Sequence, residues 1–173
     1  MSDTEKRFTL EDVKASTTEA DSARYRFVGC MYKTLIEELG QDKANELMNK
    51  AYYRYGYVKH PEAEIREGDL VHFCETYRHG EHTYYPYSMD MPCKIDEEKG
   101  VAVIQWCTGG VCGGLQWFTE GGLTPEEANS LCWNAAVAGD IGYANKCGLD
   151  AHFNHTCATG KGCCEFVVEK RKP

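Results

Sequence analysis

Apolar residues recur every three or four positions over the first third of the chain. One stripe runs from about Thr18 to Leu39, and a second runs from about Gln41 to Tyr55. This spacing predicts two amphipathic helices. Gly40 separates them at the position where many helices end, so we expect a helical hairpin. The two stripes consist of Ala20, Ala23, Phe27, Met31, Leu35 and Leu39, and of Ala44, Leu47, Met48, Ala51 and Tyr55.

After Pro61 the pattern changes to short strand-like stretches separated by turn residues. Residues 97–100, Glu-Glu-Lys-Gly, are typical of a hairpin turn between the last two stretches. The pattern therefore predicts an antiparallel meander. The four expected strands are Asp69 to Tyr77, His82 to Tyr87, Met91 to Asp96 and Val101 to Cys107.

Capping residues at its N-terminus predict a third helix. Thr124 has the character of an N-cap, Pro125 suits the first helical position, and Glu127 completes a capping box. We expect this helix to continue to about Lys146 and to end at Gly148. It is the strongest local signal in the chain.

The last segment predicts a β-hairpin, with strands at Leu149 to Thr156 and Cys163 to Glu169. Upstream, the Gly-rich residues 108–114 lack the Lys-Ser/Thr of a phosphate-binding loop, so they predict a sharp turn or a close backbone approach. The expected fold class is α+β, with a helical hairpin, a meander, a long capped helix and a C-terminal hairpin in one domain. We assign residues 1–17 to a polar N-terminal segment and 18–173 to that domain.

Composition narrows the possible functions. The chain has 173 residues, a net charge of −8 and a pI of about 5.3. This charge disfavours nucleic acid and anionic membranes as partners, and no apolar run reaches the length of a membrane span. The polar N-terminus resembles no secretory signal, so we expect a cytoplasmic protein whose ten cysteines are reduced thiols. A small molecule is the expected partner, and the sequence also allows a homo-oligomer.

Reactive residue types concentrate in the last third of the chain. Cys132 and Asp140 are eight residues apart on the third helix, about 80° around its axis, and Tyr143 is nearly in line with Cys132. If the final hairpin packs against this helix, an imidazole could join the thiol and the carboxylate, which is the composition of a hydrolytic site. His152 and His155 face opposite sides of a strand, and we favour His155 because it is close to the turn. Each of these residues could also serve packing alone.

A metal site is the alternative use of these cysteines. Cys107 and Cys112 flank the Gly-rich segment, and His155, Cys157, Cys163 and Cys164 lie on the final hairpin. These are zinc ligand types, but they form no pair of CxxC motifs. We therefore expect no cofactor, with zinc as the alternative. The many tyrosines and tryptophans are typical of core packing, and they could also line a pocket for a planar ligand.

These residues resemble the L-2-amino-thiazoline-4-carboxylic acid hydrolase family. The resemblance lies in the helix end at residues 36–40, the helix start at residues 41–44, the helix with Cys132 and Asp140, and the final turn at residues 160–166. In that turn, Gly160, Cys164 and Phe166 match positions where the family has Gly, Cys and an aromatic residue. The resemblance covers about residues 25 to 168.

The resemblance implies hydrolysis of a non-peptide C–N bond in a small cyclic amidine or a related ring compound. On this hypothesis Cys132 is a nucleophile or an oriented thiol, Asp140 is a base and His155 is a proton shuttle. Gly160 and Cys164 support the site, as do Tyr143, Cys107 and Cys112. The alternative is a non-enzymatic sensor domain that binds a small ligand or a metal in a thiol-rich pocket. A redox carrier is disfavoured because the chain has no CxxC motif.

Overall fold

The computed structural model describes residues 9–60, 63–84, 91–107 and 112–172. Its helices are α1 (Leu10–Leu39), α2 (Gln41–Val58), α3 (Leu70–Tyr84), α4 (Gly113–Glu120), α5 (Pro125–Leu131) and α6 (Ala138–Lys146), with a π-helical turn η1 (Cys132–Ala136) and a 3-10 turn η2 (Cys157–Thr159). Its strands are β1 (Cys93–Asp96), β2 (Val101–Cys107), β3 (Leu149–His155) and β4 (Cys163–Lys170). The predicted α+β fold class is confirmed.

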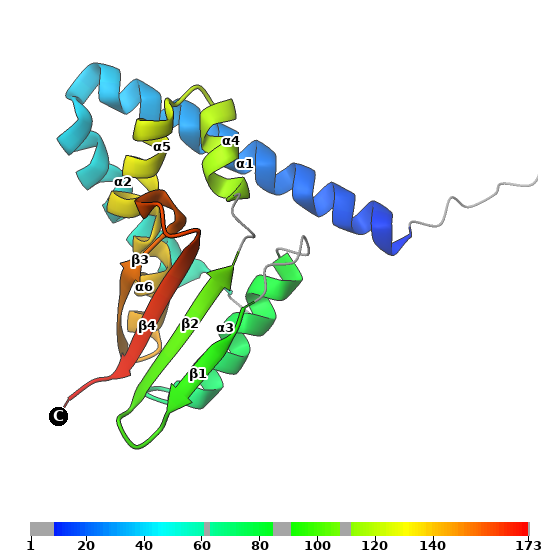
Figure 1. The fold of residues 1–173 in the computed structure, drawn as a ribbon, viewed down its shortest axis with the longest axis vertical. Coiled ribbons are helices and arrows are strands. Elements are labelled where there is room, and N and C mark those ends of the chain that lie inside the picture. Colours follow the sequence, from blue (N-terminus) through cyan, green and yellow to red (C-terminus); the bar gives the residue numbers. More distant parts are fainter. Residues whose placement is uncertain (1–8, 61–62, 85–90, 108–111, 173) are drawn as a thin grey trace, which may run out of the picture.

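The strands form one antiparallel sheet in the order β1-β2-β4-β3 (Figure 1). Two hairpins, β1–β2 and β3–β4, therefore meet where β2 pairs with β4. Helices α3 and α6 pack on one face of the sheet. The core between them consists mainly of Leu70, Phe73, Tyr77, Ile104, Trp106, Tyr143, Leu149, Phe166 and Val168.

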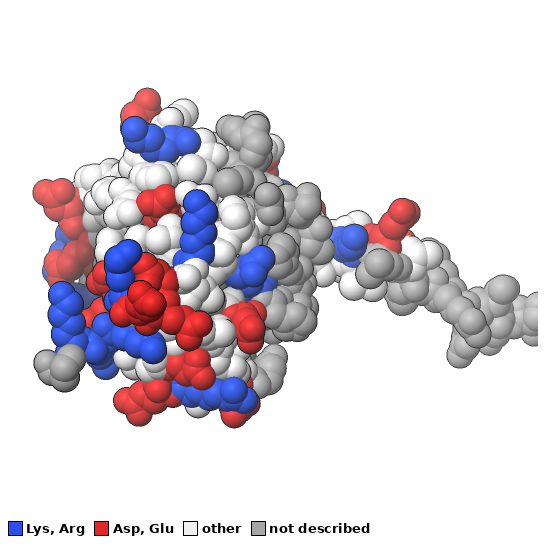
Figure 2. Space-filling view, turned by 60° about the horizontal axis from the view of Figure 1, so that its bottom comes forward, with Lys and Arg blue, Asp and Glu red and all other residues white. Residues whose placement is uncertain are grey.

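A second core lies among the helices above the sheet in Figure 1. It joins α1, α2, α4 and α5 through Tyr32, Ala44, Met48, Phe118, Leu123, Ala128 and Leu131. The N-terminal half of α1 extends beyond this layer (Figure 1). On the face shown in Figure 2, acidic and basic side chains alternate. Among the described residues on this face, side chains of both signs are therefore intermingled.

The helical hairpin is confirmed, but its first helix begins at Leu10 rather than near Thr18. Thr9 caps it: the Thr9 side chain accepts from the Asp12 amide, and the Asp12 carboxylate accepts from the Thr9 amide. This is a capping box with Asp at its third position. Residues 10–17 are thus part of a helix whose apolar stripe starts only farther along the chain.

Two predicted strands are wrong. Residues 70–77 and 82–84 belong to the helix α3, Asp69 precedes it, and residues 85–87 lie outside the described residues. Leu70, Phe73 and Tyr77 are buried at helical spacing, and the Asp69 carboxylate accepts from the His72 amide at 2.9 Å as an N-cap. The segment forms a helix rather than a strand because its apolar face packs on the sheet. This packing outweighs the local preference of β-branched and aromatic residues for strands.

The Gly-rich segment also differs from its prediction, because Gly113 and Gly114 begin the helix α4. At Gly114 the helix backbone comes close to a side chain of α1, since a Cβ atom there would lie 3.0 Å from Cε1 of Tyr25. Residues 108–111 lie outside the described residues.

The third helix spans its predicted range, and its capping box of Thr124 and Glu127 is present. It is not one regular helix, however. At η1 the amide of Val137 donates to the carbonyl of Cys132, five residues earlier, at 3.3 Å. Such π-turns are rare, and many of them lie at functional sites.

Candidate functional site

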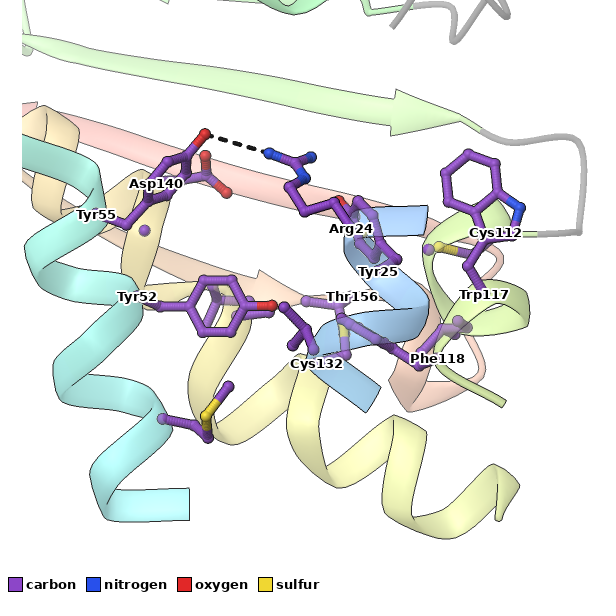
Figure 3. Close-up of a pocket in the computed structure, with 18 of the residues that line it drawn as sticks. Arg24, Tyr25, Tyr52, Tyr55, Cys112, Trp117, Phe118, Cys132, Asp140 and Thr156 are labelled. Carbon is purple, nitrogen blue, oxygen red and sulfur yellow. Dashed lines mark hydrogen bonds between the residues drawn. The ribbon is translucent and has the colours of Figure 1, made fainter. Parts of the chain in front are cut away.

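A cavity of about 410 Å³ lies where the helical layer meets the sheet. Side chains from α1, α2, α4, η1 and α6 form most of its wall, and β2, β3 and β4 close it on the sheet side (Figure 3). Cavities of this volume are typical of small-molecule sites. Elements far apart in the sequence therefore converge on one space of ligand size.

The close packing of α2 on α6 sets one wall of this cavity. A Cβ atom at Gly142 would lie 2.4 Å from the carbonyl oxygen of Tyr53, and one at Gly56 would lie 2.2 Å from that of Gly139. Only glycines allow the two backbones to come so near. This contact fixes the position of α6 relative to α2, and with it the position of Asp140, which lies between Gly139 and Gly142.

The polar end of the cavity is built around Asp140. The ammonium of Lys59 and the hydroxyl of Tyr77 both donate to its Oδ1, at 2.6 and 2.8 Å. Oδ2 accepts no hydrogen bond from the described residues. Because Asp140 is also part of the cavity wall, one carboxylate oxygen is anchored while the other remains available to a bound molecule.

Two further residues complete the polar end. Arg24 donates from Nη1 to the hydroxyl of Tyr55 at 3.3 Å (Figure 3). The other amino group of Arg24 pairs with Asp21 at 3.1 Å. Both cations of this end are therefore matched by carboxylates of the chain, Arg24 by Asp21 and Lys59 by Asp140.

Aromatic rings form the middle of the cavity. Tyr25 of α1 lies 5.5 Å from the ring centre of Trp117 and 5.0 Å from that of Phe118. On the sheet side, Trp106 stacks on Phe153 with ring centres 5.6 Å apart. A planar ligand could stack between such walls. The aromatic residues of the lining are Tyr25, Tyr52, Tyr55, Tyr77, Trp106, Trp117, Phe118 and Phe153.

Thiols occupy the opposite end of the cavity. Cys132 lies on η1, and its sulfur donates to the hydroxyl of the buried Thr156 at 3.8 Å. Burial, together with the nearby Cys157 and Asp140, raises the pKa of the Cys132 thiol to about 11. Cys132 is therefore a neutral thiol at neutral pH. Cys112 and Cys164 line the same end.

The structure brings four of the predicted site residues together at the cavity, namely Cys112, Cys132, Asp140 and Cys164. Tyr143 lies behind the wall: it is 1% exposed, and its ring stacks on Tyr77 at 6.0 Å. Tyr143 therefore supports the residue that anchors Asp140.

The other predicted residues lie elsewhere. The Nε2 atom of His155 is 3.3 Å from the sulfur of Cys163, and neither His155 nor the exposed His152 is among the residues described as lining the cavity. Gly160 has a φ of 78° in the turn after η2, where a left-handed residue is needed. The backbone of Cys107 pairs with Cys163 at the end of β2, and its side chain lies outside the described residues.

Sequence reasoning missed Lys59, Tyr77 and Thr156. Lys59 follows the end of α2 and carries no motif. The pattern predicts a strand where Tyr77 lies on the helix α3, and it predicts Thr156 only as the last residue of a strand. The helical spacing of Leu70, Phe73 and Tyr77 could have put Tyr77 on a buried face.

Metal-ligand clusters and candidate membrane-spanning helices are both absent from the part of the chain that the structure describes. Within that part, no three His, Cys, Asp or Glu side chains are grouped to hold a metal ion. Likewise, no helix among the described residues has the length and apolar character needed to cross a membrane.

No curated protein matches the chain. Among solved structures, it is similar to the phenol-responsive sensory domain of the transcription activator PoxR, determined with phenol. The two share 13% sequence identity with a TM-score of 0.51, over 84% of this chain and 74% of that one. At this identity the likeness is one of fold.

The family comparison is more extensive. The model of the L-2-amino-thiazoline-4-carboxylic acid hydrolase family matches residues 21–168. The match covers residues of both the helical hairpin and the sheet, and it includes every residue described above as lining the cavity. It confirms the resemblance that the sequence predicts. The chain therefore belongs to the L-2-amino-thiazoline-4-carboxylic acid hydrolase family.

Proposed function

We propose that the chain hydrolyses a non-peptide C–N bond of a small cyclic amidine, or of a related ring compound, bound in the cavity. One observation carries this proposal. Asp140 is anchored through Oδ1 by Lys59 and Tyr77, and its Oδ2 is available in an aromatic cavity of small-molecule size. A carboxylate held in this way can act as a general base on a water molecule.

In the proposed reaction, Oδ2 of Asp140 takes a proton from water, and the water oxygen attacks the amidine carbon. The C–N bond of the ring then breaks, and the leaving nitrogen takes the proton from Asp140. The aromatic walls hold the ring flat, which orients the attacked carbon toward the carboxylate.

Cys132 has the role of an oriented thiol in this scheme. Since its pKa is raised to about 11, it is protonated at neutral pH and is a weak nucleophile. It can donate a hydrogen bond to a heteroatom of the substrate. His155 takes no part in the proposed reaction, because its ring contacts Cys163 outside the cavity lining.

The test is a screen of the purified protein against cyclic amidines, thiazolines and lactams, with ring opening followed by mass spectrometry. Asp140→Asn should lower turnover of an accepted compound by about 100-fold or more, and Cys132→Ser by less. Cys163→Ser, outside the cavity lining, is the matched control and should retain turnover. Full turnover by Asp140→Asn would refute the assignment.

A second candidate function is non-enzymatic binding of a small planar ligand, as in a sensor domain. The aromatic walls and the protonated thiol favour it, and the fold is similar to that of a sensory domain that responds to phenol. Calorimetry distinguishes the two functions: a compound that binds with a stable heat signal and is recovered intact supports the sensor, whereas a ring-opened product supports the hydrolase.

A further inference from the structure

Two consecutive cysteines on β4 point to opposite faces of the sheet and have different neighbours. The sulfur of Cys164 lies 3.7 Å from that of Cys157, toward which it donates, and it accepts from the Cys157 amide at 3.4 Å. The sulfur of Cys163 instead lies 3.3 Å from Nε2 of His155. Cys157 and Cys164 therefore form a dithiol pair in van der Waals contact, and Cys163 does not belong to it.

Cys157 is the sulfur on which the neighbouring thiols converge. The thiol of Cys112 also hydrogen-bonds to it. Those hydrogen bonds, together with burial, raise the pKa of both Cys112 and Cys164. Burial raises that of Cys132 to about 11. Cys112 and Cys164 thus keep their protons and hydrogen-bond to Cys157, whereas the Cys132 thiol donates to Thr156.

The segment between the two cysteines allows the sulfurs to approach. A disulfide needs an S–S distance of about 2.0 Å, so the present distance of 3.7 Å has to shorten. The segment contains Gly160 and Gly162, both with positive φ, and no heavy atom lies within 4 Å of a Cβ built at either. A small rearrangement of this turn is therefore sterically open.

We propose that Cys157 and Cys164 are a peroxide-reactive dithiol site at the thiol end of the cavity, which a hydroperoxide converts to a disulfide. Cys164 is part of the cavity wall, and the partly exposed Cys157 lies in contact with its sulfur, so a small oxidant can approach the pair. This site is independent of the proposed hydrolysis, since neither cysteine takes part in that reaction.

The reaction balances in two steps. The Cys157 thiolate attacks the terminal oxygen of the hydroperoxide: an S–O bond forms, the O–O bond breaks, and the leaving alkoxide takes a proton to become an alcohol. Cys157 is now a sulfenic acid. The Cys164 sulfur then attacks the Cys157 sulfur, so that an S–S bond forms, the S–O bond breaks, and water leaves with the Cys164 proton. The peroxide is reduced and the two thiols are oxidised.

Peptide mapping tests this site directly. Trypsin cleavage after Lys146, Lys161 and Lys170 separates Cys157, in peptide 147–161, from Cys164, in peptide 162–170. The reduced protein is treated with hydrogen peroxide or cumene hydroperoxide, blocked with N-ethylmaleimide and digested. The expected product is the two peptides joined through Cys157 and Cys164, and dithiothreitol should separate them.

Matched variants locate the reactive pair. Cys163→Ser should form the same link as the wild type. Cys164→Ser should not, and its Cys157 should instead be trapped by dimedone as a sulfenic acid. A link through Cys163 or Cys112, or oxidation of other thiols that leaves these two reduced, would overturn the assignment. Peptide 147–161 also contains Cys147, and peptide 162–170 also contains Cys163. Fragment spectra of the linked wild-type peptides therefore assign the bond, even if a variant fails to fold.

Discussion

Replacing Asp140 with asparagine should destabilise the protein as well as impair its site. The Lys59–Asp140 pair is 2.6 Å long, and the two side chains are only 11% and 23% exposed. At an effective dielectric constant of about 20, the attraction at this distance is about 6 kcal/mol. Desolvation of the two charges offsets much of it. Loss of the carboxylate removes the negative charge that lies 2.6 Å from the largely buried Lys59 ammonium.

The expected loss in the free energy of unfolding is about 2–3 kcal/mol, between the value of about 0.5 kcal/mol for exposed pairs and the 3–5 kcal/mol for fully buried ones. Urea denaturation followed by circular dichroism measures it, with an unchanged slope as evidence for a simple stability effect. A double-mutant cycle with Lys59→Met isolates the coupling of the pair from other effects of each change.

The matched control is Asp96→Asn. Asp96 pairs with Lys99 at 2.7 Å, but these side chains are 43% and 78% exposed, so the loss should be much smaller than that of Asp140→Asn. If Asp140→Asn costs no more than Asp96→Asn, or if the cycle gives no coupling between Lys59 and Asp140, the electrostatic account of the polar end is wrong.

Two other predictions concern the same helix. Gly142→Ala should lower the free energy of unfolding by about 1–3 kcal/mol, because its Cβ would lie 2.4 Å from the Tyr53 carbonyl oxygen. Gly139→Ala should destabilise the protein much less, because its Cβ would lie 3.4 Å from the Tyr52 carbonyl oxygen. Thermal melts that reverse this order would contradict the packing of α2 on α6. Iodoacetamide should label Cys132 slowly at neutral pH and faster as the pH rises through its pKa of about 11. The thiol of the unfolded chain has a pKa of about 8.5. The stability that the buried Cys132 thiol contributes is therefore fully present below that pH and is lost as the pH rises to about 11. Rapid labelling at neutral pH would contradict a protonated thiol.

Much of the local structure was predictable because its signals are local. The capping box of Thr124 and Glu127 sets the start of α5 wherever the helix packs. The range Val101–Cys107 is a strand in both prediction and structure, since its turn residues bound it closely. The segment from Leu70 onward was mistaken for a strand because its aromatic and β-branched residues suit either element, and only the sheet beneath it selects the helix.

The residues of the site, too, were predictable only where their signal is local. The sequence by itself determined that Cys132 and Asp140 share a helix, because helical spacing is a local property. Its short motifs were also sufficient to indicate the family. It could not show that Lys59 and Tyr77 anchor Asp140, 81 and 63 positions away along the chain. It also placed His155 with them, whereas the hairpin directs that ring to Cys163. Only the tertiary structure decided these contacts, because they depend on how closely glycines let α2 approach α6 and on which face of β4 each cysteine occupies.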